Sequence, residues 1–385
     1  MKAKLSIYTI CFNMLIYLVL SVSIAGAAAA FPGASKTAIQ YLLTVPSLAC
    51  IAGTFLVPLL STKISQKTLS VGAEFVSLIG AAIYIIYPVN LPILYLAGII
   101  MGLAYGVLST TFPLLVTIHI AEEKRNYVIG IASGMVQFGR LASLLIAGFL
   151  GDIRWNFVYF TYFLVVVSLC ILVPCLPPDK PMPKPSEKNN SYSNLLTNRG
   201  IWELAILDFV FGVIFFMTST HISLYIEGYG LGTSSTTGII TSIACGFAGV
   251  MACLFSKIYS MTKKNTVFFI FLVTGIGYIA AGSVISLPTI LFGFFCGMTA
   301  ASIFTPYVLT RASEVTTPEM VSMAISVAVA CLSIGFFISP TITNFIAGTL
   351  GNGSPASAYF LGGLGSLLAA IIVFAITRRN KHSII

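Results

Sequence analysis

Long apolar runs, separated by short polar segments, extend through the whole chain. A helix needs about 20 mostly apolar residues to cross the roughly 30 Å hydrocarbon layer of a bilayer. Twelve runs have this length, and the breaks between them contain proline, glycine, asparagine or charged residues. The pattern predicts membrane-spanning helices at residues 5–26, 37–60, 69–88, 91–116, 126–150, 155–176, 201–225, 234–256, 266–287, 289–310, 320–347 and 356–377.

The first run also shares features with a secretory signal peptide. Lys2 and Lys4 precede it, and an alanine-rich stretch at 25–30 follows it. Its apolar part is about 20 residues long, whereas a signal peptide has about 7–15. Its removal would also leave an odd number of spans. We therefore expect this run to be retained as the first membrane helix.

The composition supports a membrane protein. Of the 385 residues, 57% are hydrophobic and 8% are charged, whereas soluble proteins have about 45–50% apolar and about 25% charged residues. So few charges cannot cover an aqueous surface, which excludes a set of soluble domains and predicts an all-α polytopic membrane protein. The eight cysteines all lie in apolar runs without a CxxC pair. We expect buried free thiols, with a disulfide or a metal site as the alternatives, and no cofactor.

The net charge of +9 is distributed in short clusters between the spans. It forms no continuous basic face, so a nucleic-acid partner is not expected. If the N-terminus is cytoplasmic, all lysines and arginines lie on the cytoplasmic side except three. The exceptions are Lys36, Arg154 and the intramembrane Arg140. The inner residues are Lys2, Lys4, Lys63, Lys67, Lys124, Arg125, Lys180, Lys184, Lys188, Arg199, Lys257, Lys263, Lys264, Arg311, Arg378, Arg379 and Lys381. This asymmetry predicts both termini on the cytoplasmic side of a cell membrane, and short loops favour a bacterial one.

The longest connection, 177–200, begins with a proline-rich stretch and continues with polar residues. Such a segment is typical of a linker, and it divides the spans six and six. The chain is therefore predicted to contain an N-terminal bundle at 1–176 and a C-terminal bundle at 201–385.

The two halves share short matches at a nearly constant offset of 194 to 196 residues. These matches lie at equivalent topological positions, which indicates a duplicated six-helix unit. They pair residues 60–64 with 254–258, Gly102 with Gly297, and Gly139 with Gly335.

Two such halves joined by a cytoplasmic linker resemble the major facilitator superfamily. The resemblance implies that the halves rock about a midplane site and so give alternating access. The loop at 58–67 keeps the Leu and two basic positions of the family pattern G-x-L-x-D-R-x-G-R-K but lacks its Gly and Asp. Gly98 stands where proton-coupled drug exporters have Arg, and Ser143-Leu144 where they have Gly-Pro. These differences count against a standard drug–proton antiporter.

Two charged residues are predicted to lie deep in the membrane, where a charge costs at least about 2.5–3.5 kcal/mol. Arg140 is roughly 20 Å into its span, and Asp208 roughly 10 Å. Ser133, Gln137 and Arg140 share one helix face, which is expected to turn away from lipid. Arg140 is either a structural partner of Asp208 or an anchor for an anionic solute. Asp208 is either that partner or a proton-coupling group, since burial disfavours its charged form.

Other polar residues give weaker signals. Glu74 is expected to reach outward from the membrane toward Lys63 or Lys67. His221 is either a proton-sensing or gating residue or a satisfied polar cap. By resemblance, spans 1, 4, 7 and 10 line the cavity. The resulting solute-binding candidates are Asn13, Tyr17, Tyr105, Gln137, Arg140, Ser302 and Thr305; interhelical hydrogen bonding is the alternative for each.

The chain carries no hydrolase, metalloprotease, P-loop or dinucleotide motif. We therefore expect a gradient-driven transporter and no enzyme. The leading hypothesis is a monomeric secondary transporter of a small organic solute, anionic and proton-coupled. The alternative is proton-driven export of amphipathic drugs or metabolites, in which Asp208 faces a cationic substrate. A channel or a sensory membrane protein is the alternative from another class, although filter repeats and charge rings are missing.

Overall fold

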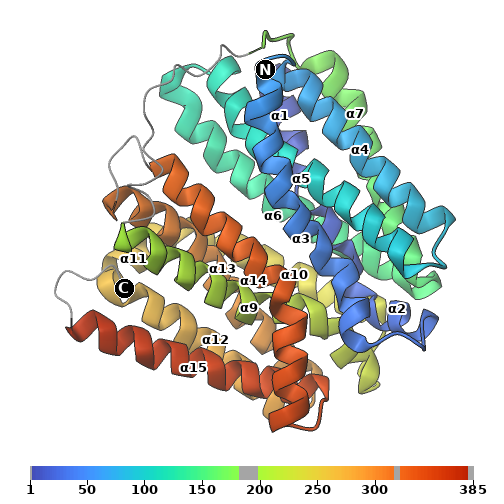
Figure 1. Ribbon diagram of the computed structural model, residues 1–385, viewed down its shortest axis with the longest axis vertical. Coiled ribbons are helices and arrows are strands. Elements are labelled where there is room, and N and C mark those ends of the chain that lie inside the picture. The colour runs from blue at the N-terminus through green and yellow to red at the C-terminus, as the bar shows by residue number, and fades with distance from the viewer. Residues whose placement is uncertain (1, 182–197, 316–320, 380–385) are drawn as a thin grey trace. The chain divides into compact units, whose positions relative to one another are not determined.

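The computed structural model describes residues 2–181, 198–315 and 321–379, and in these ranges the chain is helical apart from short connections (Figure 1). Most of the predicted linker, with Lys184 and Lys188, lies outside the described residues. The same holds for the basic C-terminal Lys381.

Twelve helical segments in the described ranges are long and apolar enough to cross a membrane. The all-α polytopic prediction with twelve spans is therefore confirmed. The first part of the chain forms α1 (Lys2–Asn13), η1 (Ile16–Val22), α2 (Ile24–Ala30), α3 (Lys36–Ser61), α4 (Gln66–Ile86), α5 (Leu91–His119), α6 (Glu122–Ile153), η2 (Trp155–Tyr162) and α7 (Phe163–Cys175), where η denotes a 3-10 helix. The second part forms α9 (Arg199–Gly228), α10 (Ser234–Cys253), α11 (Phe255–Thr262), η3 (Lys263–Asn265), α12 (Thr266–Ser283), α13 (Leu287–Val315), α14 (Val321–Leu350) and α15 (Pro355–Arg379).

The helices group into two compact units. Unit 1 comprises Met1–Ser186 and Gly232–Cys245, and unit 2 comprises Glu187–Leu231 and Gly246–Ile385. The first part of α10 therefore belongs to unit 1 and its last part to unit 2. The division into bundles at 1–176 and 201–385 stays a prediction.

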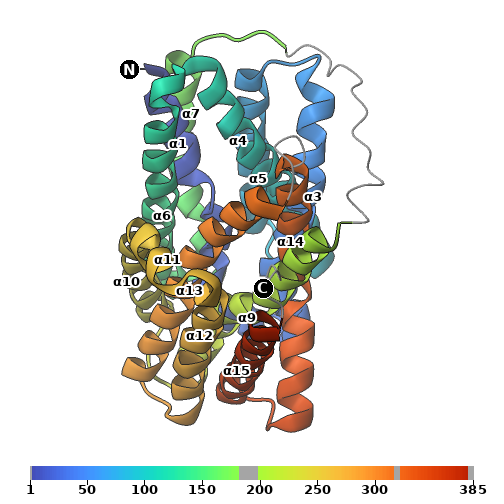
Figure 2. The same cartoon turned by 90° about the vertical axis from the view of Figure 1, so that its left-hand side faces the viewer.

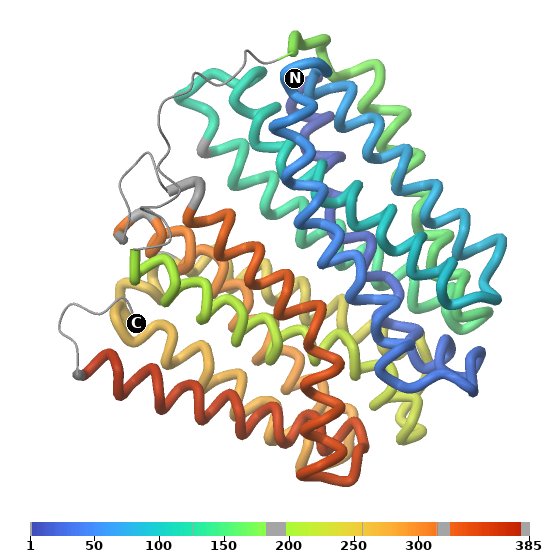
Figure 3. Tube along the Cα trace, in the orientation of Figure 1, coloured from blue at the N-terminus to red at the C-terminus, as the bar shows by residue number. Residues whose placement is uncertain are grey.

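In unit 1, α5 packs against both α3 and α4, and α1 packs against α6 and α7 (Figure 1, Figure 3). Glycine permits the closest of these approaches. A Cβ at Gly102 of α5 would lie 2.2 Å from the Pro46 carbonyl oxygen of α3, closer than any side chain tolerates. Buried apolar residues from α1, α5, α6 and α7, including Ile7, Leu115 and Leu172, form the core beneath these crossings.

In unit 2, α9 packs against α14, and α12 lies between α13 and α15 (Figure 2). A Cβ at Gly335 of α14 would lie 2.5 Å from the Phe209 carbonyl oxygen of α9. Gly139 of α6 is the predicted counterpart of Gly335. A Cβ at Gly139 would likewise meet a backbone carbonyl oxygen, that of Phe12 on α1. The other predicted pair differs, because Gly102 faces Pro46 of α3 whereas Gly297 faces the Tyr278 hydroxyl of α12.

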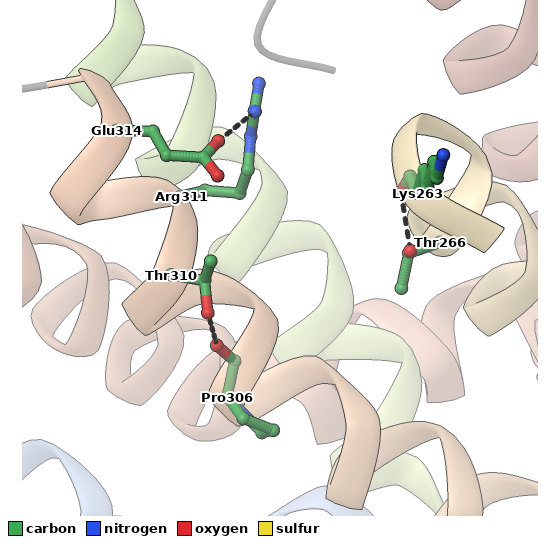
Figure 4. Close-up of polar contacts among 6 residues, drawn as sticks. All are labelled: Lys263, Thr266, Pro306, Thr310, Arg311 and Glu314. Carbon is green, nitrogen blue, oxygen red and sulfur yellow. Dashed lines mark hydrogen bonds and ion pairs between the residues drawn. The ribbon is translucent and has the colours of Figure 1, made fainter. Parts of the chain in front are cut away.

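The end of α13 is held by local polar contacts (Figure 4). The Thr310 hydroxyl donates to the Pro306 carbonyl at 2.9 Å, and Arg311 pairs with Glu314 one turn later. A second ion pair joins Arg199 and Glu203 of α9 at 2.8 Å. Both of these pairs lie in unit 2.

Candidate functional site

The first predicted span is broken near its middle. The α-helix α1 ends at Asn13, the Met14 amide bonds back to the Cys11 carbonyl at 3.2 Å, and the chain continues as the 3-10 helix η1. Carbonyls at a helix end lack intrahelical donors and carry partial negative charge. Nothing in the sequence signals the break, because neither proline nor glycine lies between Asn13 and Ile16.

Helix α6 crosses α1 directly before this break. A Cβ at Gly139 would lie 1.8 Å from the Phe12 carbonyl oxygen, so only glycine allows the two backbones to meet. The crossing brings the next residue, Arg140, to the broken end of α1. Arg140 is buried, with 7% of its surface exposed, and its Nε atom has no hydrogen-bond partner among the described residues.

Two tyrosines lie near this arginine. The rings of Tyr17 on η1 and Tyr105 on α5 are 4.9 Å apart between centroids. The Arg140 charge acts on the phenol groups of both. Three elements therefore bring together three of the predicted solute-binding residues.

Tyr17 and Tyr105 also line a small cavity in unit 1. It lies beside the break in the first span, and both polar and apolar side chains line it. The lining residues are Asn13, Met14, Ile16, Tyr17, Glu74, Ser77, Met101, Tyr105, Leu108, Tyr162 and Val165. The predicted Asn13, Tyr17 and Tyr105 thus share one cavity, and Glu74 joins them.

The prediction that Glu74 reaches toward Lys63 or Lys67 is wrong. Glu74 is completely buried, and the Ser168 hydroxyl of α7 donates to its Oε1 atom at 2.9 Å. Lys67 instead donates to the carbonyls of Val173 and Leu176, at 2.8 and 2.6 Å. Helix α4 begins at Gln66, three residues before the predicted start. Glu74 therefore lies about 12 Å along the helix, on the face that packs inward.

The predicted stripe on α6 is only partly buried. Ser133 is exposed and donates to the Ile129 carbonyl at 3.0 Å, and Gln137 is half-buried. Arg140 alone is fully enclosed. That this face turns away from lipid stays a prediction.

The candidates in unit 2 make local contacts. His221 is buried, and its ring nitrogens contact Thr220 at 3.0 Å and Asn344 of α14 at 3.1 Å. Ser302 is buried and donates to the Met298 carbonyl at 2.8 Å. Thr305 is exposed and donates to the backbone of its own helix. Their roles in solute binding or gating stay predictions.

Asp208 on α9 is the buried acid of unit 2. It is 2% exposed, and its Oδ2 atom has no hydrogen-bond partner in the part of the chain that the structure describes. Arg140 belongs to unit 1 and Asp208 to unit 2, so the predicted pairing of the two stays a prediction.

The cysteines are free thiols. Cys11, Cys50, Cys245 and Cys296 are buried as expected, whereas Cys170 and Cys253 lie on the surface, which the expectation of uniformly buried thiols missed. Within residues 2–181, 198–315 and 321–379, no cluster of three or more His, Cys, Asp or Glu side chains could hold a metal ion.

Comparison with known proteins identifies the family of this two-unit helical fold. The profile of the Major Facilitator Superfamily matches residues 5–281. The chain belongs to this superfamily. No curated protein sequence matches it.

Solved structures share the fold of this superfamily member at low sequence identity. The nucleoside transporter NupG is 14% identical with a TM-score of 0.76, and the alignment covers 98% of this chain and 100% of that one. A POT family transporter in complex with 5-aminolevulinic acid is 14% identical with a TM-score of 0.77, covering 98% and 96%. The xylose transporter XylE from E. coli is 14% identical with a TM-score of 0.72, covering 97% and 95%.

The superfamily and these neighbours indicate a multi-pass membrane protein that acts as a secondary transporter rather than an enzyme. At these identities the structural likeness shows the fold alone. The solute must therefore be argued from the side chains of this chain.

Proposed function

We propose that this protein transports a small organic solute with an anionic group, and that Arg140 anchors that group. The observation that carries the proposal is the environment of Arg140. Its guanidinium is buried, and its Nε atom has no hydrogen-bond partner among the described residues. A guanidinium presents a planar fork of donors that fits a carboxylate or phosphate. A solute anion would offset the cost of burying this charge.

The remaining candidates supply polar contacts and a shaped wall. Tyr17 and Tyr105 lie beside the Arg140 charge and also line the cavity, so their hydroxyls can orient a solute held by the arginine. Met101 and Leu108 give the cavity an apolar side. Asn13 and Gln137 from unit 1, with Ser302 and Thr305 from unit 2, are the further contacts we propose.

The compounds that these structural neighbours transport or bind are consistent with a small solute. The neighbours are a nucleoside transporter, a xylose transporter and a POT family transporter that holds 5-aminolevulinic acid, a compound with a carboxyl group. We place the protein in the cell membrane as a monomer, with both termini cytoplasmic, because this orientation puts most basic residues on the inner side.

A second candidate function rests on Asp208. Its buried carboxyl has an unpartnered Oδ2 atom in the described part of the chain, so it could face a cationic, amphipathic compound that is exported in exchange for protons. In that case Arg140 would be structural.

Thermal unfolding of the detergent-purified protein against panels of organic anions, cations and neutral compounds tests the two candidates. A ligand at 100 times its Kd adds about 2.7 kcal/mol of stability. We expect some anions to raise the unfolding temperature of the wild type and to have no effect on Arg140→Ala. Arg140→Lys should recover part of the shift, because an ammonium keeps the charge but loses the fork.

The matched control is Arg154→Ala, which removes an exposed arginine just after α6 and should leave the anion shift unchanged. Stabilisation by lipophilic cations alone would contradict the anion proposal and support the second candidate. An anion shift that survives in Arg140→Ala would remove Arg140 from the site.

A further inference from the structure

Unit 1 contains a second buried charge besides Arg140. The Glu74 side chain has no exposed surface, and its only described hydrogen bond is the one that Ser168 donates to Oε1 at 2.9 Å. The Oε2 atom has no hydrogen-bond partner among the described residues. A buried carboxylate without a cation or a full set of donors is costly. Packing alone therefore does not explain why a carboxyl group is buried at this position.

The Asn13 side chain faces this carboxyl. Asn13 is 3% exposed, lines the same cavity and lies next to Glu74. Neither its amide nitrogen nor its amide oxygen makes a regular hydrogen bond in the described part of the chain. Asn13 is also the last residue of α1. The broken helix thus places the Asn13 amide against the Glu74 carboxyl.

An amide suits both protonation states of such a carboxyl. An ionised Oε2 would accept from the Asn13 amide nitrogen, and a protonated Oε2–H would donate to the Asn13 amide oxygen. Rotation of the amide exchanges the two arrangements. In broken membrane helices of transporters, half-helix ends recur as sites for protons and sodium ions.

The other ionisable groups around Glu74 do not compete for this role. The cavity presents the phenols of Tyr17 from η1, Tyr105 from α5 and Tyr162 from η2. Cys11 of α1 is a buried thiol in the adjoining core. No lysine, arginine or histidine lines the cavity.

Lys67 and Arg140 are cations of unit 1 that do not line this cavity. Lys67, at the start of α4, is committed to two carbonyls of the α7 region. Arg140, from α6, acts on Tyr17 and Tyr105. Cys170 of α7 is exposed on the surface.

We propose that Glu74 and Asn13 form a proton-binding site, with Glu74 as the carrier of the coupling proton and Asn13 as its positioning residue. Water on one side of the membrane supplies the proton to Oε2, and the same O–H bond breaks when the proton leaves to water on the other side. This inference rests on the proposed function, since the proton would travel with the solute anion held at Arg140. The pair would then cross without net charge, which avoids the cost of moving a charge through the bilayer.

The test uses the proton itself as the probe and requires no solute. Infrared difference spectra of the purified protein between acidic and alkaline pH are expected to show the band of a protonated carboxyl. Glu74→Gln should lose that band, and Glu203→Gln, which removes an acid already paired with Arg199, should keep it. Glu74→Gln should also make the unfolding temperature less dependent on pH than it is in the wild type.

Two serines provide a second pair of variants. Ser168→Ala removes the donor to Oε1 and should move the midpoint of the carboxyl band toward alkaline pH, because the ionised form loses a hydrogen bond. Ser77→Ala is the control, since the Ser77 hydroxyl lines the same cavity but donates to the Glu74 backbone carbonyl at 2.7 Å. Asn13→Ala should also shift the midpoint, which a purely structural role would not do.

Three results would overturn the proposal. One is a carboxyl band that persists unchanged in Glu74→Gln, and another is a midpoint that neither Ser168→Ala nor Asn13→Ala moves. The third is stabilisation of the wild type by sodium chloride but not by choline chloride, abolished in Glu74→Gln, since it would assign the site to a metal cation. These readouts do not depend on the Arg140 anion panel, so either proposal can fail without the other.

Discussion

The first helices of the two units differ although they make the same crossing. In unit 1, the Phe12 carbonyl faces Gly139, and α1 ends one residue later at Asn13. In unit 2, the Phe209 carbonyl faces Gly335, and α9 continues without a break to Gly228. The residue after Phe209 is Val210, which has no polar side chain. A shared scaffold therefore carries a broken helix in one unit and an intact helix in the other.

The polar side chains of the two helices are satisfied to different degrees. On α9, Thr218 bonds to Tyr278 and His221 bonds to Asn344, although both lie in a buried stretch. At the end of α1, the Asn13 amide lines a cavity beside Glu74. The outer half of α9 thus uses its polar groups to join neighbouring helices, although the Oδ2 atom of Asp208 on the same helix has no partner among the described residues. In unit 1, the polar end of the broken helix lies at a cavity instead.

The largest expected effect comes from adding a side chain to the glycine at each helix crossing. Gly139→Ala would place a Cβ 1.8 Å from a carbonyl oxygen, and Gly335→Ala would place one at 2.5 Å. We expect Gly139→Ala to lower the free energy of unfolding by about 3 kcal/mol and Gly335→Ala by about 2 kcal/mol, because overpacking forces the backbones apart. Thermal unfolding in detergent measures both. Gly130→Ala, on the same helix with nothing within 4 Å, should not destabilise; equal losses in all three variants would refute the crossing as the cause.

The next effect comes from exchanging side chains at the position that follows each crossing, which is Asn13 on α1 and Val210 on α9. Asn13→Val should lower the free energy of unfolding by about 1 kcal/mol, because it removes the amide that faces the buried Glu74 carboxyl. Val210→Asn should lower it by a similar amount, because it introduces a polar group into the intact helix. Thermal unfolding of both variants tests the comparison. An unchanged stability of Asn13→Val would show that the amide does not support the carboxyl.

An effect of similar size concerns the polar contact that joins α9 to α14. Asn344→Ala removes the partner of the His221 Nε2 atom and should cost about 1 kcal/mol of stability. The loss should shrink in a His221→Ala background, because the same hydrogen bond is then already absent. A double-mutant cycle by thermal unfolding measures this coupling. Additive losses would mean that the two side chains do not interact.

The smallest effect tests whether the protonation midpoint of Glu74 depends on how the start of α4 is held. The Asp179 carboxylate accepts from the Gln66 and Lys67 amides at the start of α4, at 2.7 and 3.1 Å. Asp179→Ala should cost about 0.5–1 kcal/mol, as loss of a helix cap does. The midpoint of the Glu74 carboxyl band should stay unchanged. A shift as large as that of Asn13→Ala would mean that the position of α4, and not the amide, controls the carboxyl.

The sequence was sufficient for the membrane class, the twelve spans and the family, because hydropathy acts over whole segments and averages out local detail. It also identified Asn13, Tyr17 and Tyr105, which share a cavity. The environment of Glu74 could not be obtained in this way. Its depth depends on where α4 begins, and a shift of three residues changes the face and the height at which a side chain lies.

The helix break was equally beyond the sequence. Asn13 is one polar residue in an apolar run, and such residues occur in intact helices as well. The break depends on the packing of α6 against Phe12 and on the 3-10 geometry that follows, both of which are tertiary. For the same reason, Gly102 and Gly297 match in sequence yet face different neighbours.

The two 3-10 segments bear on how well unit 1 matches a bilayer. The spans that contain η1 and η2 have 21 residues each, whereas those of α5 and α6 have 29 and 32. A 3-10 helix rises about 2.0 Å per residue and an α-helix about 1.5 Å. Seven residues of η1 therefore add about 3.5 Å to the reach of the first span, roughly the difference in thickness between membranes of different lipid composition. Backbone winding, as well as the number of apolar residues, thus tunes the membrane thickness to which this protein is suited.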